Sequence, residues 1–350
     1  MNIVLKLVDC TRSKHNLTLL YQYNEITFTT TLWYSTVDFH QLESEYDKEY
    51  MEKIYFHILL FHGLKILSLK PTHLDLGKYS KYWKNNLQKL WNISVEQCLG
   101  QWRYETGNLD YQGAEIIHQD VTPLTIGAVT LVPEKTPLLL CNGGGKDSLL
   151  MARLLDDRDR PFDSFSNEDY IQQEFISNLT VFSLLKPMSD PLVYRLLSQK
   201  VRDDDLKLVY SCNTSPPWCK SCPKCAYVYL SYMAYVTPEQ EKELQHFLGK
   251  ENLFDRPDLQ LYYRQLMGLE PHNAFECVGE IEENKLALEK CVERGFAGEA
   301  ISSYIQEARL DKSQYQQLWK NFQQLDLSYQ RLPPKLMEIL IEECQELAKN

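Results

Sequence analysis

The chain has 350 residues, of which 44% are hydrophobic, and this is enough for one large or two ordinary domains with their own cores. Its formal net charge of -11 argues against a nucleic-acid partner, because neutralising phosphates requires clustered Lys and Arg. No window approaches the about 20 apolar residues of a membrane span, and the start lacks the features of a secretory signal, so we expect a cytoplasmic protein with no membrane partner.

The first 130 residues predict an α+β domain. Residues 2–10 and 17–34 are rich in β-branched and aromatic residues with partial alternation, which is typical of strands. Apolar residues recur near helical spacing at 51–69 and at 82–99, which predicts two helices.

The pattern changes after residue 130. A short apolar run at 138–141 is followed by glycines and then by a helical pattern, which predicts a strand, a turn and a helix. One further strand is predicted at 179–184. The last third of the chain predicts helices near 237–249, 257–268, 281–294, 311–323 and 334–348.

The glycine-rich turn is the most informative stretch of the sequence. A turn of this kind aims backbone N–H groups and the positive end of the helix dipole at one point, which favours a phosphate. Lys146 adds a positive charge, Asp147 can hold Mg²⁺ or orient the loop, and Ser148 can donate a hydrogen bond. The candidate nucleotide-binding residues are Gly143, Gly144, Gly145, Lys146, Asp147 and Ser148. The alternative is a glycine-rich turn that binds no ligand.

This loop resembles the SGGxDS loop of the PP-loop ATP pyrophosphatases, although Gly143 stands where that pattern has its first Ser. Members of this class split ATP between its α and β phosphates and form an adenylate on a carboxyl or carbonyl oxygen. The resemblance implies ATP and Mg²⁺ as cofactors, with Lys146 and Asp147 in the catalytic machinery.

Four cysteines downstream form a pattern of C-x6-C-x2-C-x2-C, at Cys212, Cys219, Cys222 and Cys225. In a cytosolic chain of this length, clustered cysteines are more often metal ligands than disulfides. Four thiolates suit structural Zn²⁺ with no open coordination position. An iron–sulfur cluster and four thiols without a ligand are the alternatives.

Two PP-loop families carry such cysteines after the loop, namely 7-cyano-7-deazaguanine synthase and the UDP-N-acetylmuramoyl-L-alanyl-L-glutamate epimerases. The chain resembles the epimerase family more closely. The resemblance rests on FHILLFHGLKIL (56–67), QWRYETGNLDYQG (101–113), NGGGKDSLL (142–150), FSLLKPMSD (182–190), WCKSCPKCAYVYL (218–230) and HNAFECVGE (272–280).

The epimerase resemblance implies that ATP activates the terminal glutamate carboxyl of a UDP-N-acetylmuramoyl dipeptide as an adenylate, with release of pyrophosphate. A base then removes the Cα proton, which returns on the opposite face. Cys277 and Glu276 are candidate bases by analogy with thiol and carboxylate bases; a packed turn before a helix is the alternative for both. The other functional hypotheses are a carboxylate-activating enzyme of the deazaguanine synthase type and a non-catalytic protein that binds a nucleotide or a partner.

We therefore expect an α/β protein with three parts: an N-terminal α+β domain at 1–130, a PP-loop domain at 131–211, and the cysteine cluster with a helical region at 212–350. Residues 149–211 leave room for perhaps two further strands after the loop, whereas a PP-loop domain has about five. The sequence thus predicts a shortened PP-loop domain that lacks a central piece, and an inactive protein is one expectation that follows.

Overall fold

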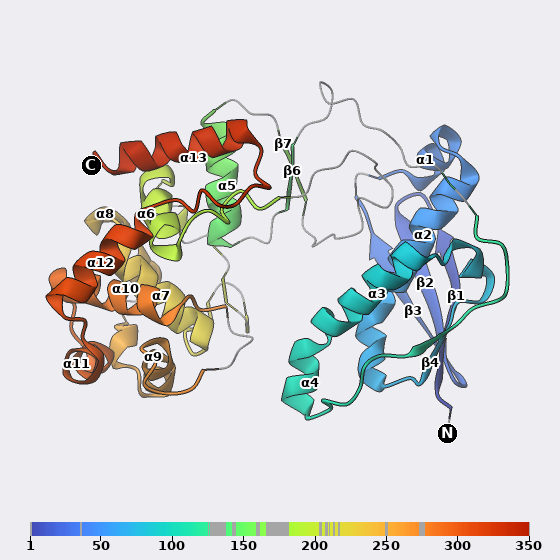
Figure 1. Ribbon diagram of the computed structural model, residues 1–350, viewed down its shortest axis with the longest axis horizontal. Coiled ribbons are helices and arrows are strands. Elements are labelled where there is room, and N and C mark those ends of the chain that lie inside the picture. Colours follow the sequence, from blue (N-terminus) through green and yellow to red (C-terminus); the bar gives the residue numbers. More distant parts are fainter. Residues whose placement is uncertain are drawn as a thin grey trace. The chain divides into compact units, whose positions relative to one another are not determined.

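The computed structural model describes two units, which we treat separately (Figure 1). The described residues are 2–35, 37–124, 126, 138–141, 145–158, 162–165, 182–202, 205–206, 209, 211–212, 214–215, 218–248, 251–272 and 277–349. Unit 1 contains the described residues up to 126, and unit 2 contains those from 138 onward. The fold is mixed α/β, as expected.

Unit 1 is built on a five-stranded mixed sheet in the order β3-β2-β1-β4-β5. The strands are β1 (Val4–Arg12), β2 (Asn16–Tyr23), β3 (Ile26–Trp33), β4 (His73–Asp75) and β5 (Glu115–Ile117). The first three form an antiparallel meander, whereas β4 pairs in parallel with both β1 and β5. Asn24, which has a positive φ of 51°, lies between β2 and β3, a backbone conformation that Asn tolerates better than most residues.

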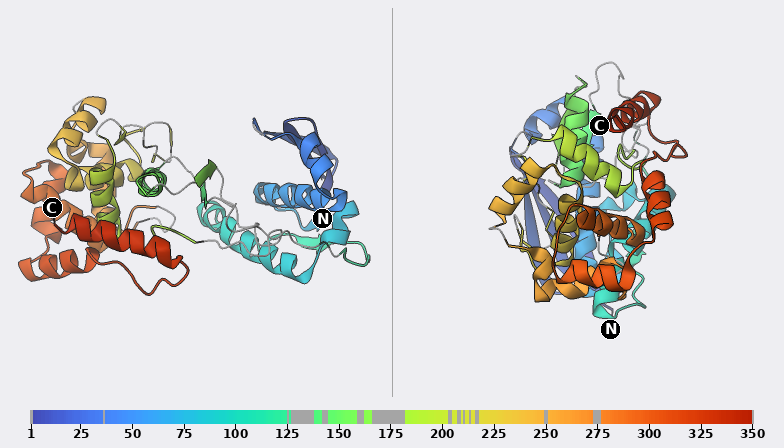
Figure 2. Two further views of the ribbon diagram at one scale, coloured as in Figure 1. Left: turned by 90° about the horizontal axis from the view of Figure 1, so that it is seen from above. Right: turned by 90° about the vertical axis from the view of Figure 1, so that its left-hand side faces the viewer.

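The helices of unit 1 lie on one side of this sheet, as the left view of Figure 2 shows. They are α1 (Phe39–Glu45), α2 (Lys48–His62), α3 (Asn85–Cys98) and α4 (Gly100–Thr106), with 3-10 turns at Gly63–Leu69 and Gly77–Tyr82. The sheet buries alternate residues such as Leu17, Leu19 and Tyr21 against α2, because side chains on a strand alternate between its two faces. The hydroxyl of Tyr21 donates to the carbonyl of Leu59 at 2.8 Å, which fixes α2 on the sheet.

Unit 2 is mainly helical. Its strands β6 (Leu138–Cys141) and β7 (Phe162–Phe165) pair in parallel. The helices are α5 (Lys146–Asp156), α6 (Asp190–Lys200), α7 (Pro223–Tyr235), α8 (Pro238–Phe247), α9 (Gln260–Leu266), α10 (Ile281–Glu293), α11 (Glu299–Ser303), α12 (Lys312–Phe322) and α13 (Pro334–Leu347), with 3-10 turns at Leu253–Asp255 and Pro257–Leu259 and a π-helical turn at Tyr304–Ala308.

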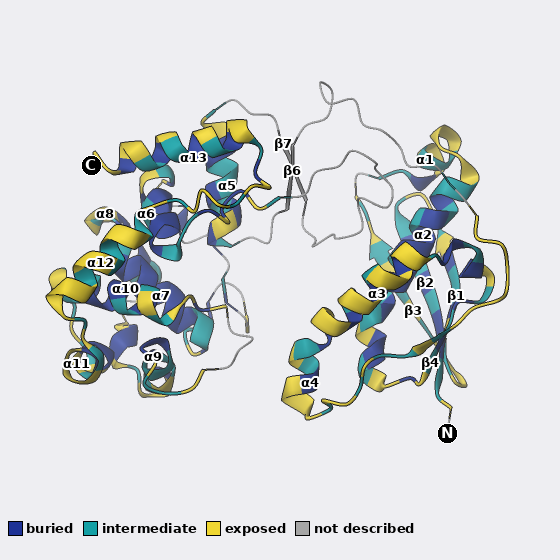
Figure 3. Cartoon of the chain, in the orientation of Figure 1, coloured by how far each residue is buried: buried dark blue, intermediate teal, exposed yellow. Residues whose placement is uncertain are grey.

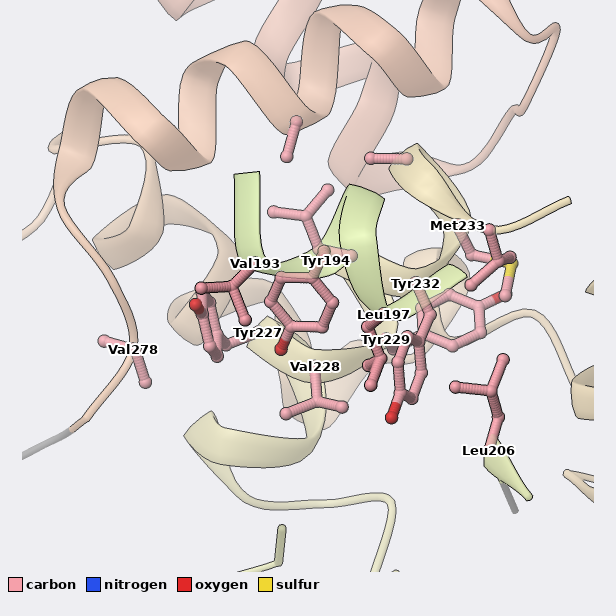
Figure 4. Packing of buried hydrophobic residues seen from close by; sticks show 14 of the residues in the cluster. Val193, Tyr194, Leu197, Leu206, Tyr227, Val228, Tyr229, Tyr232, Met233 and Val278 are labelled. Atoms are coloured by element: carbon pink, nitrogen blue, oxygen red, sulfur yellow. The ribbon is translucent and has the colours of Figure 1, made fainter. Parts of the chain in front are cut away.

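Helix α7 lies at the centre of unit 2 and is buried on nearly every face, whereas α12 and α13 expose one face (Figure 3). A helix that is apolar all round has to be covered by other elements. Figure 4 shows how its tyrosines pack with residues of α6, among them Val193, Tyr194 and Leu197. This core holds the first turns of α6 and α7 in fixed positions.

The strand predicted at 179–184 is wrong for its described part. Residues 182–184 are not a strand, and residues 179–181 lie outside the described residues. The backbone N–H of Ser183 donates to the hydroxyl of Tyr329 at 3.0 Å, so a tertiary contact takes the hydrogen bond that a neighbouring strand would have provided.

In the described parts of the chain, no helix combines the length and the apolar character that crossing a membrane requires.

Unit 2 contains a buried carboxylate that joins three helices. Glu343 on α13 pairs with Arg158, just after α5, at 3.0 Å and with Lys200 on α6 at 2.7 Å. The Glu343 side chain is 1% exposed, whereas Glu342 beside it, which also pairs with Arg158, is 54% exposed.

We expect Glu343→Gln to lower the free energy of unfolding of unit 2 by about 2–3 kcal/mol, because it removes the charge that two partly buried cations share. The matched variant Glu342→Gln should cost about 0.5 kcal/mol or less, since its pair is exposed. Urea unfolding measures both. Equal losses would show that burial of Glu343 does not matter.

Candidate active site and metal centre

The described part of the glycine-rich loop has the order strand, loop, helix. Strand β6 ends at Cys141, and α5 begins at Lys146 with Gly145 as its N-cap residue. The carbonyl of Gly145 accepts the first helical hydrogen bond, from the N–H of Leu149 at 3.2 Å. Gly143 and Gly144 lie outside the described residues, so their predicted contacts with phosphate stay predictions.

The loop lysine is buried and surrounded by carboxylates. The Nζ of Lys146 donates to Asp147 Oδ1 at 2.7 Å and to Asp190 Oδ1 at 3.3 Å, and it lies 5.1 Å from the centre of the Tyr194 ring. Burial lowers the pKa of Lys146, but the charges of Asp190 and Asp147 outweigh that effect and raise it. Lys146 is therefore a buried ammonium whose charge is already balanced.

Asp190 connects α6 to two other helices. Its Oδ2 accepts a hydrogen bond from the hydroxyl of Tyr227 on α7, and its backbone N–H donates to Glu283 Oε1 on α10 at 3.1 Å. Ser189 caps α6 by accepting from the N–H of Leu192. Sequence reasoning missed Asp190 as a site residue. The sequence Ser189-Asp190-Pro191 could have indicated it, because it is a typical helix start that places an acidic residue in the first turn.

Three ionisable groups surround the pair of Lys146 and Asp190. Burial raises the pKa of the Glu283 carboxyl and that of the Tyr227 hydroxyl. Lys224, in the first turn of α7, lies 5.0 Å from the centre of the Tyr227 ring. Burial and then the positive charge of Lys146 lower the pKa of Lys224.

Cys277, the candidate base, belongs to the segment that approaches this cluster. Its side chain is exposed, while its carbonyl accepts a hydrogen bond from Lys224 Nζ. Gly279 follows with a positive φ of 71°, and a Cβ at this position would lie 3.0 Å from the Tyr227 ring. Glycine thus permits the close approach of this segment to α7. Glu276 lies outside the described residues.

The structure therefore brings together five parts of the chain that the sequence presents separately. The first turns of α5, α6, α7 and α10 converge with the segment at 277–279, and each contributes a side chain or a backbone group. Each buried charge in such a cluster is stabilised by an ion pair or a hydrogen bond with a neighbouring group. A bound ligand of complementary charge can take the place of some of these neighbouring groups. This cluster is the candidate active site.

The four predicted metal ligands also converge. Their Sγ atoms all lie within 4.8 Å of one another; Cys212 and Cys222 are 3.9 Å apart, and Cys219 and Cys225 are 3.8 Å apart. Zinc–sulfur bonds of about 2.3 Å in a tetrahedron place sulfurs about 3.8 Å apart, so this donor set fits a tetrahedral Zn²⁺.

Backbone N–H groups point at these sulfurs. Cys212 Sγ accepts from the N–H groups of Thr214, Ser215 and Cys219, each at 3.3 Å. Cys222 caps α7 by accepting from the N–H of Cys225 at 3.4 Å. The cysteine segment and the candidate active site are thus joined through the first turn of α7.

Two other buried charged residues have structural roles. Arg103 in unit 1 is buried and donates to the carbonyls of Glu96 and Tyr111. Asp205 in unit 2 is buried and pairs with Arg153 at 2.8 Å and Arg202 at 3.0 Å. The pairing cations explain why the carboxylate is tolerated there.

Comparison with known proteins identifies the region that holds the cysteines. Residues 208–319 match the family model described as the MurL C-terminal domain. The resemblance to the epimerase family that the sequence motifs predicted is therefore confirmed. A search of solved structures finds no match.

Three curated relatives share the printed name UDP-N-acetyl-alpha-D-muramoyl-L-alanyl-L-glutamate epimerase. The protein from Micromonospora sp. is 38% identical over 120 residues, 32% of this chain and 26% of the relative. The protein from Salinispora tropica is 36% identical over 114 residues, 31% of this chain and 24% of the relative. The protein from Xanthomonas oryzae pv. oryzae is 31% identical over 129 residues, 34% of this chain and 27% of the relative. The chain thus matches about a quarter of the length of these relatives.

The two carboxylates that contact Lys146 should differ in their contribution to stability. Asp147 is 55% exposed, whereas Asp190 is 30% exposed and also accepts from the buried Tyr227. We expect Asp190→Asn to lower the free energy of unfolding by about 2 kcal/mol and Asp147→Asn by about 0.5 kcal/mol or less. Urea unfolding of the two variants measures the difference. A larger loss for Asp147→Asn would contradict the assigned geometry.

Proposed function

Since residues 208–319 match the MurL C-terminal domain model, we propose that this protein is an ATP-dependent epimerase of the terminal L-glutamate of a UDP-N-acetylmuramoyl dipeptide. The reaction would proceed through a carboxyl adenylate with release of pyrophosphate. The observation that carries the proposal is the convergence of Lys146, Asp190, Tyr227 and the 277–279 segment next to a loop of the glycine-rich type. The names of the three relatives support the substrate class.

The chemistry requires activation of the carboxyl group. A free carboxylate carries a negative charge that opposes removal of the neighbouring Cα proton, whereas an acyl adenylate does not. The site offers groups for this step in one place: the ammonium of Lys146 for developing negative charge, and the hydroxyl of Tyr227 with Asp190 to hold that ammonium in place. Cys277 stays the candidate base on the strength of the family resemblance.

The nucleotide would be held at the start of α5. ATP supplies the adenylyl group, and the residues that would hold its phosphates are Gly143, Gly144, Gly145, Lys146 and Ser148, with Asp147 as a ligand of Mg²⁺. Asp147 fits this role, because its side chain is 55% exposed and carries a charge next to the first turn of the helix. We place the activity in the cytoplasm, where clustered thiols stay reduced.

Zn²⁺ would have a structural role. Cys212, Cys219, Cys222 and Cys225 supply four thiolates, which fill a tetrahedral shell and leave no position for substrate. The ion would anchor the start of α7 and, through it, the positions of Lys224 and Tyr227.

The proposed activity is tested with the purified chain, ATP, Mg²⁺ and UDP-N-acetylmuramoyl-L-alanyl-L-glutamate in D₂O. We expect release of pyrophosphate and entry of deuterium at Cα of the glutamate. The double variant Lys146→Ala, Asp147→Ala should lose at least about a hundredfold in rate, because it removes charged groups of the reacting site. Asp205→Asn, which breaks an ion pair on α5 away from the loop, is the matched control and should keep its rate.

Three other results would decide against the proposal. Product formation that depends on ammonia would favour the deazaguanine synthase type of reaction. Pyrophosphate release without deuterium at Cα would show activation of a carboxylate without epimerisation. Binding of ATP without pyrophosphate release would favour the non-catalytic alternative and the shortened nucleotide-binding domain.

Metal removal gives an independent prediction. The purified chain should contain about one zinc ion, and a strong chelator should lower the thermal stability of unit 2, because binding of a structural metal contributes directly to folding. Cys222→Ser should have the same effect, whereas Cys291→Ser, a buried cysteine outside the cluster, should leave the zinc content unchanged. Iron in the purified protein, or unchanged stability without metal, would contradict the assignment.

A further inference from the structure

The two lysines of the candidate active site differ in how their charges are balanced. Lys146 contacts two carboxylates, Asp147 and Asp190. Within the described parts of the chain, Lys224 forms no ion pair, and its one hydrogen bond goes to the carbonyl of Cys277. Carboxylates therefore compensate the charge of the loop lysine, whereas no carboxylate among the described residues pairs with Lys224.

Lys224 still has hydrogen-bonding capacity. An ammonium group carries three N–H donors, and the Cys277 carbonyl uses one of them. The Tyr227 ring lies beneath the ammonium, with its centre 5.0 Å from Nζ, and holds the cation without supplying a negative charge. A partly buried cation without a carboxylate partner carries a free-energy cost that a bound anion removes.

The surroundings of Lys224 connect it to Lys146. Tyr227 also donates to Asp190, which contacts Lys146, so the two ammonium groups are linked through one tyrosine and one carboxylate. Tyr227 and Tyr194 pack edge to face with ring centres 6.2 Å apart, and each lies under one of the two lysines. Figure 4 shows the two buried rings, and their contact sets the spacing of the two cations that lie over them.

We propose that Lys224 is a second ligand-binding cation of this site, and that it receives an oxyanion of the ligand. The oxyanion is a phosphate of the nucleotide or an acidic group of the UDP-dipeptide substrate, which share the negatively charged oxygens that an ammonium binds. This inference rests on the proposed function, and it assigns to a residue between two cysteines of the cluster a role that neither the loop nor the cysteine pattern indicates.

Lys220 provides a matched control in the same segment. Lys220 donates to the backbone carbonyl of Leu248 at 2.8 Å, so, like Lys224, it connects the cysteine segment to the backbone of another segment. Unlike Lys224, it lies 3.9 Å from a carboxylate, that of Glu251. Lys224→Gln and Lys220→Gln each remove one positive charge from this segment. If only Lys224→Gln weakens ligand binding, Lys224 contacts the ligand. If both variants lose stability to the same extent, the two lysines serve only to hold the cysteine segment in place.

The experiment is calorimetry of the zinc-loaded 350-residue chain and three variants, Lys224→Gln, Lys220→Gln and Lys224→Arg. Each is titrated with ATP in the presence of Mg²⁺, with pyrophosphate, and with UDP-N-acetylmuramoyl-L-alanyl-L-glutamate, at low and at high salt. We expect Lys224→Gln to weaken at least one of the three affinities about tenfold, because a charge-assisted hydrogen bond is lost. The salt dependence of that affinity should fall as well. Lys224→Arg should restore the affinity to within about threefold, and Lys220→Gln should bind as the unmodified chain does.

The ligands identify the source of the oxyanion. A loss confined to ATP and pyrophosphate assigns Lys224 to the phosphates, and a loss confined to the UDP-dipeptide assigns it to the substrate. Unchanged affinities in Lys224→Gln, or equal losses in Lys224→Gln and Lys220→Gln, would overturn the inference while leaving the proposed function intact. If the unmodified chain binds none of the three ligands, both the inference and the proposed function are wrong.

Discussion

The contact on which the candidate site depends is the one between the buried ammonium of Lys146 and the carboxylate of Asp190. A buried lysine retains its charge only when opposite charges outweigh the cost of removing it from water. Asp190 meets this requirement at 3.3 Å and is itself fixed by the hydroxyl of Tyr227 and, through its backbone, by Glu283. The ion pair between Lys146 and Asp190 therefore depends on how α5, α6, α7 and α10 are packed against one another.

Helix α7 connects this ion pair to the cysteine cluster. Cys222 caps the helix, Lys224 lies in its first turn and Tyr227 follows one turn later, so a displacement of the cysteines would move both side chains. The buried tyrosines of α7 hold the helix in one position, because aromatic rings in a close-packed core have few alternative positions. The cysteine cluster and the candidate active site therefore share the first turn of α7.

Much of the local structure followed from patterns of short range. Helical spacing predicted the segments that became α8, α10, α12 and α13 to within one or two residues, and the hairpin strands of unit 1 followed from β-branched and aromatic runs. The strand predicted at 179–184 failed over 182–184, because an apolar run of that length does not distinguish a strand from a segment held by tertiary contacts.

The sequence by itself determined the chemical types at the site: a glycine-rich turn followed by Lys146 and Asp147, and four cysteines at ligand spacing, because both motifs are contiguous in the chain. Only the tertiary structure decided which distant groups join them. Asp190 lies 44 residues from Lys146 along the chain, and Cys277 lies 53 residues from Lys224. Such pairings depend on the packing of α6, α7 and α10 around a common core, and no pattern of short range in the sequence contains that information.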